Sequence, residues 1–241
     1  LGKKGVRWLP VRLSARYTGE VLRVLLRDQG IIVPLTKSIK TEPVNSMLLY
    51  RHESAELYKL VRRMLDRSTN VAAEIIGLNA AKLWGFNTSD IQSSGDIMTR
   101  WFNYVTETQG SIFANHSGLT INSRVSASDF TKFLTRPETI ELLSPVLKVR
   151  KIYGNKANVI SSSGVDVIAK TGTMHFNRGL AGYIRRDGFP KAAFAIFSAD
   201  IEKKKMIPKH TLANPLGSKA WLSRARRQEN SILSRWAENY T

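Results

Sequence analysis

Cysteine is absent from the 241 residues of this chain. The sequence therefore excludes a disulfide framework, a thiolate metal site and a cysteine nucleophile. Acidic residues are also scarce, because 19 Asp and Glu stand against 37 Lys and Arg, which leaves a formal net charge of +18. Such a charge attracts polyanions, namely nucleic acid, anionic lipid or acidic wall polymers, without choosing among them. The cations are dispersed along the chain, so an ordinary solvated basic surface explains them equally well.

Long hydrophobic runs are missing too. Crossing a bilayer takes about 18 consecutive apolar residues, whereas the longest apolar stretches here, such as 192–197, have the length of a strand. The first residue is Leu1 and not methionine, and no apolar stretch with a small-residue cleavage site follows it, so we expect further sequence upstream, where a signal peptide would lie. Hydrophobic residues nevertheless make up 42% of the chain, which is enough for one substantial globular core.

The first 45 residues predict a helix, a strand and a linker. Apolar residues recur at helical spacing over 14–28, the pattern stops at Gly30, and residues 31–34 have the composition of a short strand. Residues 35–47 are rich in Lys, Thr, Pro, Ser and Asn, which is typical of a linker. We therefore place a domain boundary here and treat 1–45 and 46–241 as separate parts.

The middle of the chain predicts four helices and a turn, because apolar residues recur there every three or four positions. The helices are expected over 54–67, 71–83, 95–108 and 126–135, and the turn over 115–120. The second helix is apolar nearly all round, so we expect it to be buried. The fourth opens with Ser126 and carries Asp129 three positions later, a pattern that suits a capped helix start.

The last third of the sequence changes from helical spacing to strand spacing. Strands are expected over 165–169, 180–185 and 191–198, with a hairpin turn over 186–190 and a closing helix over 218–240. One face of that helix carries apolar residues, namely Trp221, Ala225, Ile232, Trp236 and Tyr240. The simplest packing of these elements is an α/β (α+β) arrangement in which helices cover an antiparallel sheet.

The sharpest chemical signal is Lys170-Thr171-Gly172-Thr173, at the end of a predicted strand. The lysine and the first threonine offer a cation and a hydroxyl to a carboxylate. Gly172 has no side chain, so a ligand backbone can lie close against the strand. A tripeptide of this kind also arises by chance, and the competing interpretation is an ordinary exit from a strand into a turn.

A second signal, Ser68-Thr69-Asn70, lies between two predicted helices. The hydroxyl of Ser68 is suited to relaying a proton, and the amide of Asn70 to holding a substrate amide. Taken alone, the triplet is better explained as a cap for the helix that follows, because S-x-N arises about once by chance in such a chain. Its value comes from its joint occurrence with the Lys170 motif, about a hundred residues further on.

Together and in this order, the two signals resemble the second and third signature motifs of penicillin-binding proteins and class A β-lactamases, whose first motif is S-x-x-K. The chain is most similar to the low-molecular-mass class C penicillin-binding proteins, which are D-alanyl-D-alanine carboxypeptidases/endopeptidases with a large domain inserted between the first and second motifs. The similarity covers residues 50–200 well and 13–34 more weakly. The residues that carry it are His52-Glu53-Ser54, Asp66-Arg67-Ser68-Thr69-Asn70, Ala73-Glu74, Ser117-Gly118-Leu119-Thr120, Lys170-Thr171-Gly172-Thr173 and Leu180-Ala181-Gly182-Tyr183.

The chain departs from this family pattern in two places. The family's turn commonly reads Asp-x-Ser-Gly-Leu-Ser, whereas Asn115 and Thr120 stand at its two ends here, both conservative exchanges. More seriously, no serine in the sequence is followed by lysine three positions later. The resemblance therefore implies that the nucleophilic serine and its S-x-x-K motif lie upstream of Leu1.

The resemblance implies a partial β-lactamase/transpeptidase-like fold, with residues 1–45 as the end of the inserted domain. It also implies a serine acyl-enzyme mechanism in the periplasm, with peptidoglycan stem peptides and β-lactams as ligands and without a metal or another cofactor. Three residues would be catalytic, by relaying a proton, holding the substrate amide and supplying positive potential: Ser68, Asn70 and Lys170. Three would bind substrate. Thr171 would offer a hydroxyl to the terminal carboxylate, Gly172 would let the substrate lie close to the strand, and Thr173 would contribute its backbone N–H to the oxyanion hole.

The expected upstream segment matters for folding as well. In the related fold, two of five strands precede S-x-x-K, so the strand at 191–197 is expected to lack one neighbour, which favours aggregation. We therefore expect residues 1–241 alone to fold poorly and neither to hydrolyse penicillin nor to bind it covalently.

Two other classes of protein stay open at this point. A non-catalytic cell-wall-binding protein would keep the fold without the nucleophile. A basic nucleic-acid-binding protein is motivated by charge alone, and because no binding motif or aromatic-basic stripe accompanies the charge, we do not expect nucleic acid as a partner. Carboxypeptidase and endopeptidase action are not distinguished, because both cut a bond after D-alanine.

Overall fold

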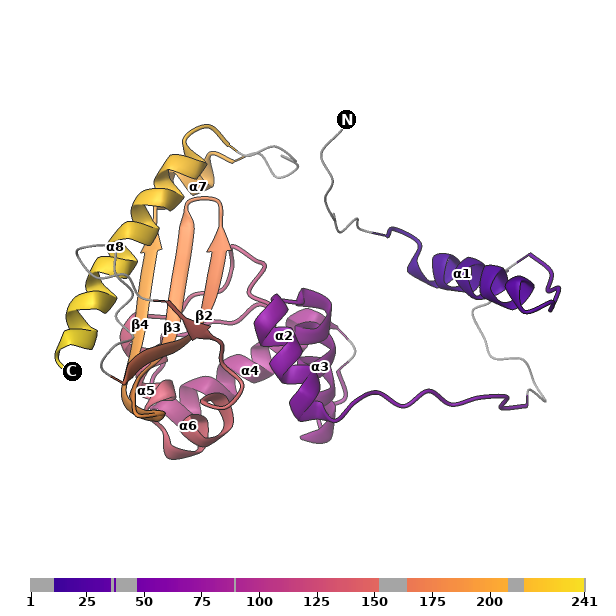
Figure 1. Cartoon of the computed structure of the whole chain (residues 1–241), viewed down its shortest axis with the longest axis horizontal. Coiled ribbons are helices and arrows are strands. Elements are labelled where there is room, and N and C mark those ends of the chain that lie inside the picture. The colour runs from indigo at the N-terminus through magenta and orange to yellow at the C-terminus, as the bar shows by residue number, and fades with distance from the viewer. Residues whose placement is uncertain are drawn as a thin grey trace. The chain divides into compact units, whose positions relative to one another are not determined.

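The computed structural model describes residues 11–35, 37, 47–88, 90–151, 164–207 and 215–240 (Figure 1). The chain divides into two compact units, Leu1–Ser54 and Ala55–Thr241. The boundary predicted between residues 45 and 46 involves residues outside this description, so it stays a prediction.

The first unit contains the predicted helix, α1 (Ser14–Asp28), none of whose residues is buried. The strand predicted over 31–34 was wrong, because this segment is not part of a strand. The Ile31 amide instead donates to the Leu26 carbonyl, and the amide of Gly30, at φ +79°, donates to that of Arg27. These two bonds close the C-terminus of α1, so Ile31 caps the helix.

The second unit contains a four-stranded antiparallel sheet of order β1-β2-β3-β4, which confirms the predicted fold class. Its strands are β1 (Val149–Arg150), β2 (Val165–Met174), β3 (Asn177–Arg186) and β4 (Phe189–Ala199). The three predicted strands exist but are longer than expected, and β1 was not predicted. Among the described residues, β4 forms one edge of the sheet.

The position of the Lys170 motif in the sheet corrects the prediction that it follows a strand. β2 continues to Met174, and its pairing with β3 runs without interruption from Val165↔Arg186 to Met174↔Asn177. Lys170 lies opposite Ala181, so the motif is inside a strand whose partner continues the ladder. The sequence missed this because Gly172 interrupts the apolar pattern that marks a strand.

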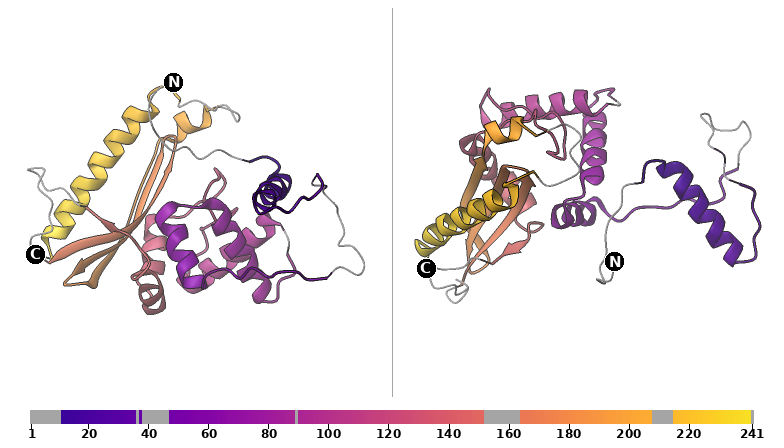
Figure 2. Two further views of the ribbon diagram at one scale, coloured as in Figure 1. Left: turned by 45° about the vertical axis from the view of Figure 1, so that its right-hand side comes forward. Right: turned by 90° about the horizontal axis from the view of Figure 1, so that it is seen from above.

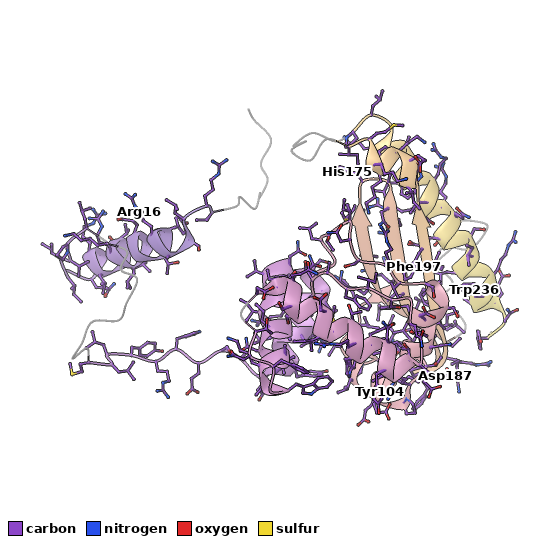
Figure 3. The ribbon with its side chains drawn as sticks, turned by 180° about the vertical axis from the view of Figure 1, so that it is seen from behind. Arg16, Tyr104, His175, Asp187, Phe197 and Trp236 are labelled. Carbon is purple, nitrogen blue, oxygen red and sulfur yellow. The ribbon has the colours of Figure 1, made fainter. Side chains whose placement is uncertain are left out.

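Both hairpins use two-residue turns with a residue at positive φ. The turn between β3 and β4 is Asp187-Gly188, with φ of 51° and 82°, which is tighter than the predicted 186–190 turn and has the φ signs of a type I′ turn. The turn between β2 and β3 is His175-Phe176, with φ 54° at Phe176. Figure 3 shows His175 and Asp187 at opposite ends of the sheet.

The two faces of the sheet are covered by different helices (Figure 2). On one face, Val165, Val167 and Ala169 are buried in a cluster with Leu233 and Ala237 of α8 (Ser218–Glu238). On the other face, Ile168 and Tyr183 pack with Leu134 of α5 (Ala127–Leu134), and the Tyr183 hydroxyl donates to the Leu134 carbonyl at 2.9 Å. Because side chains alternate along a strand, Lys170 lies on the same face as Ile168.

The remaining helices can be compared with those predicted from the spacing of apolar residues. They are α2 (Leu57–Arg67), α3 (Asn70–Leu83), α4 (Ile91–Thr106), α5 (Ala127–Leu134), α6 (Pro137–Leu143) and α7 (Ile201–Lys205). The Ser126 cap of α5 is confirmed, since its side chain accepts from the Asp129 amide. α4 begins four residues before the predicted position, where the Asp90 side chain accepts from the Ser93 amide. α6 and α7 were not predicted.

One expectation about burial was wrong, and the buried face of a second helix differs from its apolar pattern. α3 is apolar nearly all round, yet Ala81 is its one buried residue, and Val71 and Ile75 are exposed. In α8, the predicted apolar face includes Trp236, which is exposed, whereas the charged Glu229 is buried. Apolar spacing predicted both helices but not which of their residues are buried. Spacing cannot indicate that a charged residue is buried with a partner.

The partner of Glu229 is Arg178 of β3. The Arg178 Nε and Nη2 atoms donate to the two carboxylate oxygens of Glu229 at 2.8 and 2.7 Å, and both residues are 8% exposed. Such a bidentate, buried pair holds α8 at a defined position against β3. Burial costs each charge much of its hydration, so either charge would destabilise the fold if the other were removed.

We predict that Glu229→Ala in the full-length protein lowers the free energy of unfolding by about 3–5 kcal/mol, because it leaves the Arg178 charge buried without its partner. The urea midpoint of the far-UV circular dichroism signal measures this. The control is Glu202→Ala, which breaks an exposed pair with Lys205 and should cost less than about 1 kcal/mol. Equal costs for the two variants would show that the buried pair is not a structural determinant.

Candidate active site

The Ser68 motif forms the junction between α2 and α3. α2 ends at Arg67, and Ser68 follows in the left-handed region, with φ 55° and ψ 49°. This conformation costs an L-residue about 1–2 kcal/mol. Thr69 then has extended backbone and α3 begins with Asn70. The junction turns the chain sharply and leaves the Ser68 side chain exposed instead of packed in a helix.

The structure brings Ser68 and Lys170 together across 102 positions of sequence. The Lys170 Nζ atom donates to the Ser68 Oγ atom at 2.5 Å and to the Thr171 carbonyl oxygen at 2.8 Å. The end of α2 therefore meets β2 on the face of the sheet that carries Ile168. Asn70 is exposed, and its side chain makes no hydrogen bond with another described residue.

Lys170 occupies a setting that disfavours its charged form. Partial burial lowers the pKa of Lys170 below the ordinary lysine value, and the guanidinium groups of Arg150 and Arg178 lower it further. Positive charge therefore accumulates around the Ser68 hydroxyl. A neighbouring anion would stabilise the ammonium of Lys170 and relieve this repulsion.

The two threonines of the motif are each contacted by an arginine. The Arg150 Nη2 atom lies 3.5 Å from the Thr171 Oγ1 atom, and the Arg178 Nη1 atom donates to the Thr173 Oγ1 atom at 2.8 Å. Between them, Gly172 is exposed, and a Cβ atom added there would meet no atom within 4 Å. Gly172 is thus not required by packing, and the space beside the strand is open to a ligand.

The turn at 115–118 is held against α3 by a carboxylate to which the sequence assigned no role. Glu74, one turn after Asn70, accepts hydrogen bonds from the His116 amide at 3.0 Å and the Ser117 amide at 3.1 Å. The His116 Nε2 atom lies 2.7 Å from the Ser94 Oγ atom. A Cβ atom at Gly77 would lie 2.1 Å from the His116 ring, so α3 needs glycine there.

The ionisation of Glu74 and His116 follows from this packing. Burial alone would raise the pKa of Glu74, but hydrogen bonds from Ser117 and His116 outweigh it and hold the pKa below the usual value. Burial lowers the pKa of His116 despite the nearby carboxylate, which favours the neutral imidazole. Ser94 is fully buried and out of reach of a substrate, so we interpret the Ser94–His116 contact as structural.

Other contacts around the site are also structural. The Lys148 Nζ atom lies 2.7 Å from the Asp66 carboxylate, which ties α2 to the residue that precedes β1 and lowers the pKa of Asp66. The His175 Nδ1 atom lies 3.1 Å from the Ser218 Oγ atom, so its position is explained by α8.

Within the described ranges, no group of three or more His, Asp or Glu is placed to hold a metal ion. None of the helices described is both long enough and apolar enough to cross a membrane.

Residues 2–213 match the D-Ala-D-Ala carboxypeptidase 3 (S13) family. The chain belongs to this family. The resemblance that rests on the Ser68 and Lys170 motifs is therefore confirmed by a match over residues 2–213. The roles of the individual S13 site residues stay predictions.

Two curated S13 relatives are distant in sequence. The chain is 26% identical over 211 residues to the D-alanyl-D-alanine carboxypeptidase DacB of Haemophilus influenzae, an alignment that covers 80% of this chain and 43% of that protein. It is 25% identical over 158 residues to the carboxypeptidase DacB of Mycolicibacterium smegmatis, covering 61% of this chain and 34% of that protein. The chain thus spans less than half the length of these relatives.

Solved structures show the same fold. Penicillin-binding protein 4 (DacB) of Haemophilus influenzae, complexed with a β-lactam, matches with a TM-score of 0.62 at 21% identity, covering 94% of this chain and 52% of that one. The predatory endopeptidase Bd0816 of Bdellovibrio bacteriovorus, in complex with the immunity protein Bd3460, matches with a TM-score of 0.50 at 18% identity, covering 93% of this chain and 56% of that one. The match to penicillin-binding protein 4 confirms the predicted transpeptidase-like fold.

We predict that Glu74→Gln lowers the free energy of unfolding at pH 7 by about 1–3 kcal/mol, because two backbone amides lose a charged acceptor. The pKa of Glu74 is lowered in the folded protein, so its stabilisation is present above the unfolded-state pKa and is lost as pH falls through the folded-state pKa. Urea unfolding of the full-length protein between pH 7 and pH 3 should show the two stabilities converging towards acid. Glu141→Gln, at an exposed position of α6, should change little, and a pH-independent gap for Glu74→Gln would contradict the assignment.

Proposed function

We propose that this chain is part of a serine-type D-Ala-D-Ala carboxypeptidase/endopeptidase that acts on peptidoglycan stem peptides through an acyl-enzyme, with its nucleophilic serine in upstream sequence. The observation that carries this proposal is the hydrogen bond from Lys170 to Ser68. It joins a cation and a hydroxyl from separate motifs at one point of the fold. Membership of the S13 family supports the same conclusion.

The proposed reaction starts with the upstream serine, which loses its proton to the lysine of its own motif and attacks the carbonyl carbon of the D-Ala-D-Ala bond. The amide C–N bond then breaks, and the leaving amine takes up one proton. Ser68 relays that proton from the upstream lysine. Its Oγ atom accepts a hydrogen bond from Lys170, which leaves its own O–H to donate to the amine, and Oγ then takes up the proton held by the upstream lysine. Water subsequently hydrolyses the ester and regenerates the serine.

The remaining residues bind and polarise the substrate. In this proposal Asn70 holds the substrate amide, Thr171 binds the terminal carboxylate, and Gly172 lets the peptide lie close to β2. The Thr173 N–H completes the oxyanion hole with the N–H of the nucleophile. Strand geometry supports this assignment, because the Ala169 amide donates towards β1, and the amides of alternate residues, including Thr173, face the same edge.

β-Lactams would acylate the same serine by mimicking the dipeptide, which fits the β-lactam complex of the related Haemophilus protein. We place the enzyme in the periplasm, with stem peptides as its substrates. A non-catalytic cell-wall-binding protein is the second candidate, because the sequence holds no S-x-x-K motif. The gene sequence upstream of Leu1 separates the two.

We predict that residues 1–241 alone form no covalent adduct with benzylpenicillin, whereas the full-length protein gains the mass of one penicilloyl group. Intact-mass spectrometry after incubation measures this difference. The upstream serine replaced by alanine is the matched control and should abolish the adduct. A stable adduct on residues 1–241 would show that one of their own serines is the nucleophile.

We also predict that Lys170 sets the alkaline limit of the rate of penicillin acylation. The lowered pKa of Lys170 means that its ammonium is present below that pKa and is lost as pH rises through it, below the pH at which an ordinary lysine titrates. The rate of penicillin acylation should therefore fall on the alkaline side. Lys170→Arg keeps the charge and should move the limit to higher pH, while Lys170→Met should be slow at every pH. An unchanged alkaline limb in Lys170→Arg would assign it to another group.

A further inference from the structure

Arg150 is a cation beside the motif that sequence reasoning did not single out. It belongs to β1, whose described residues pair with β2 as Val149↔Ile168 and Arg150↔Val167. From there its guanidinium extends along the outer edge of β2. The Nε atom lies 3.3 Å from the Ala169 carbonyl oxygen, and the Nη2 atom lies 3.5 Å from the Thr171 Oγ1 atom.

Within the part of the chain that the structure describes, these contacts leave most of the hydrogen-bonding capacity of Arg150 unused. A guanidinium has five N–H donors in a rigid, planar arrangement, and the two contacts of Arg150 are both longer than the 2.7–3.2 Å of a typical bond. The side chain is half-buried, so its position is defined without being closed to solvent. Structural arginines in this protein are bound differently, as Arg178 shows with its bidentate contact to Glu229.

The charges around Thr171 are also unbalanced. Among the described residues, Arg178 and Lys148 have carboxylate partners in Glu229 and Asp66, whereas neither Arg150 nor Lys170 has an ion-pair partner there. Both unbalanced cations contact Thr171, Lys170 at its carbonyl oxygen and Arg150 at its hydroxyl. Two cations that contact the same residue at a strand edge form a setting for an anion.

We propose that Arg150 is a substrate-binding residue that acts with Thr171 to bind the carboxylate next to the scissile amide, and so selects ligands that carry this carboxylate. The inference rests on the proposed function. A carboxylate offers two oxygens in one plane, which a guanidinium binds through two parallel N–H groups and an ammonium does not. Arg150 therefore supplies geometric selection, whereas Lys170 is already engaged with Ser68.

The test is a comparison of two substrates in the full-length protein. One is a tripeptide that ends in D-Ala-D-Ala with a free carboxylate, and the other is the same peptide with a C-terminal carboxamide. The ratio of their kcat/KM values, from release of D-alanine or D-alaninamide, measures selection for the carboxylate. Arg150→Met and Arg150→Lys are compared with Lys151→Met, which removes the same charge from the next, exposed residue.

We expect the wild-type protein to prefer the acid and Arg150→Met to lose roughly ten- to hundredfold of that preference, as a charge-assisted hydrogen bond predicts. The loss should appear mainly in KM for the acid, with turnover of the amide unchanged. Arg150→Lys should recover part of the ratio, and Lys151→Met should keep all of it.

Two results would overturn the assignment while leaving the proposed function intact. An unchanged ratio for Arg150→Met in an active enzyme would show that Arg150 makes no contact with the carboxylate, and the inference would be wrong. An equal loss for both substrates would show that Arg150 only supports the strand. Failure of the wild-type protein to hydrolyse either peptide would instead overturn the proposed function itself, and the inference with it.

Discussion

The antiparallel pairing of β2 with β3 is the constraint on which the candidate site depends. Successive residues of a strand point to opposite faces, so the burial of Ala169 against α8 directs Lys170 to the face where α2 ends. A shift of one residue in register would turn Lys170 into the α8 core and remove it from Ser68. The apolar residues at 165, 167 and 169, all almost completely buried, resist such a shift.

The distribution of charge indicates more about function than the net charge does. The chain carries 37 Lys and Arg, yet most of them say nothing about function. What separates Lys170 and Arg150 from Arg178 and Lys148 is the presence or absence of an ion-pair partner among the described residues. The paired cations fasten helices to the sheet, and the other two meet at Thr171. Two such cations favour the binding of an anionic ligand beside Thr171.

Sequence reasoning predicted the elements better than their surroundings. Strand alternation and helical spacing located β2, β3, β4, α2, α3, α5 and α8, because these patterns depend on local backbone geometry. The contact of Ser68 with Lys170 was not predictable from spacing, since no local rule brings residues 102 positions apart together. The family resemblance indicated it, because it assigned both residues to one catalytic site. Arg150 was missed because its position depends on pairing between β1 and β2, which two residues of sequence do not reveal. Glu229 was missed because its partner lies on a strand 51 positions earlier.

The edge of the sheet connects the folding of this chain to its chemistry. β4 has eleven residues, and Phe197 on it is 41% exposed. A long edge with exposed apolar side chains pairs readily with other chains unless a neighbour covers it. In the proposed enzyme that neighbour and the nucleophilic serine come from the same upstream segment. Removal of that segment would therefore take away the covering strand and the reacting hydroxyl together, so the loss of activity and the tendency to aggregate should have one cause.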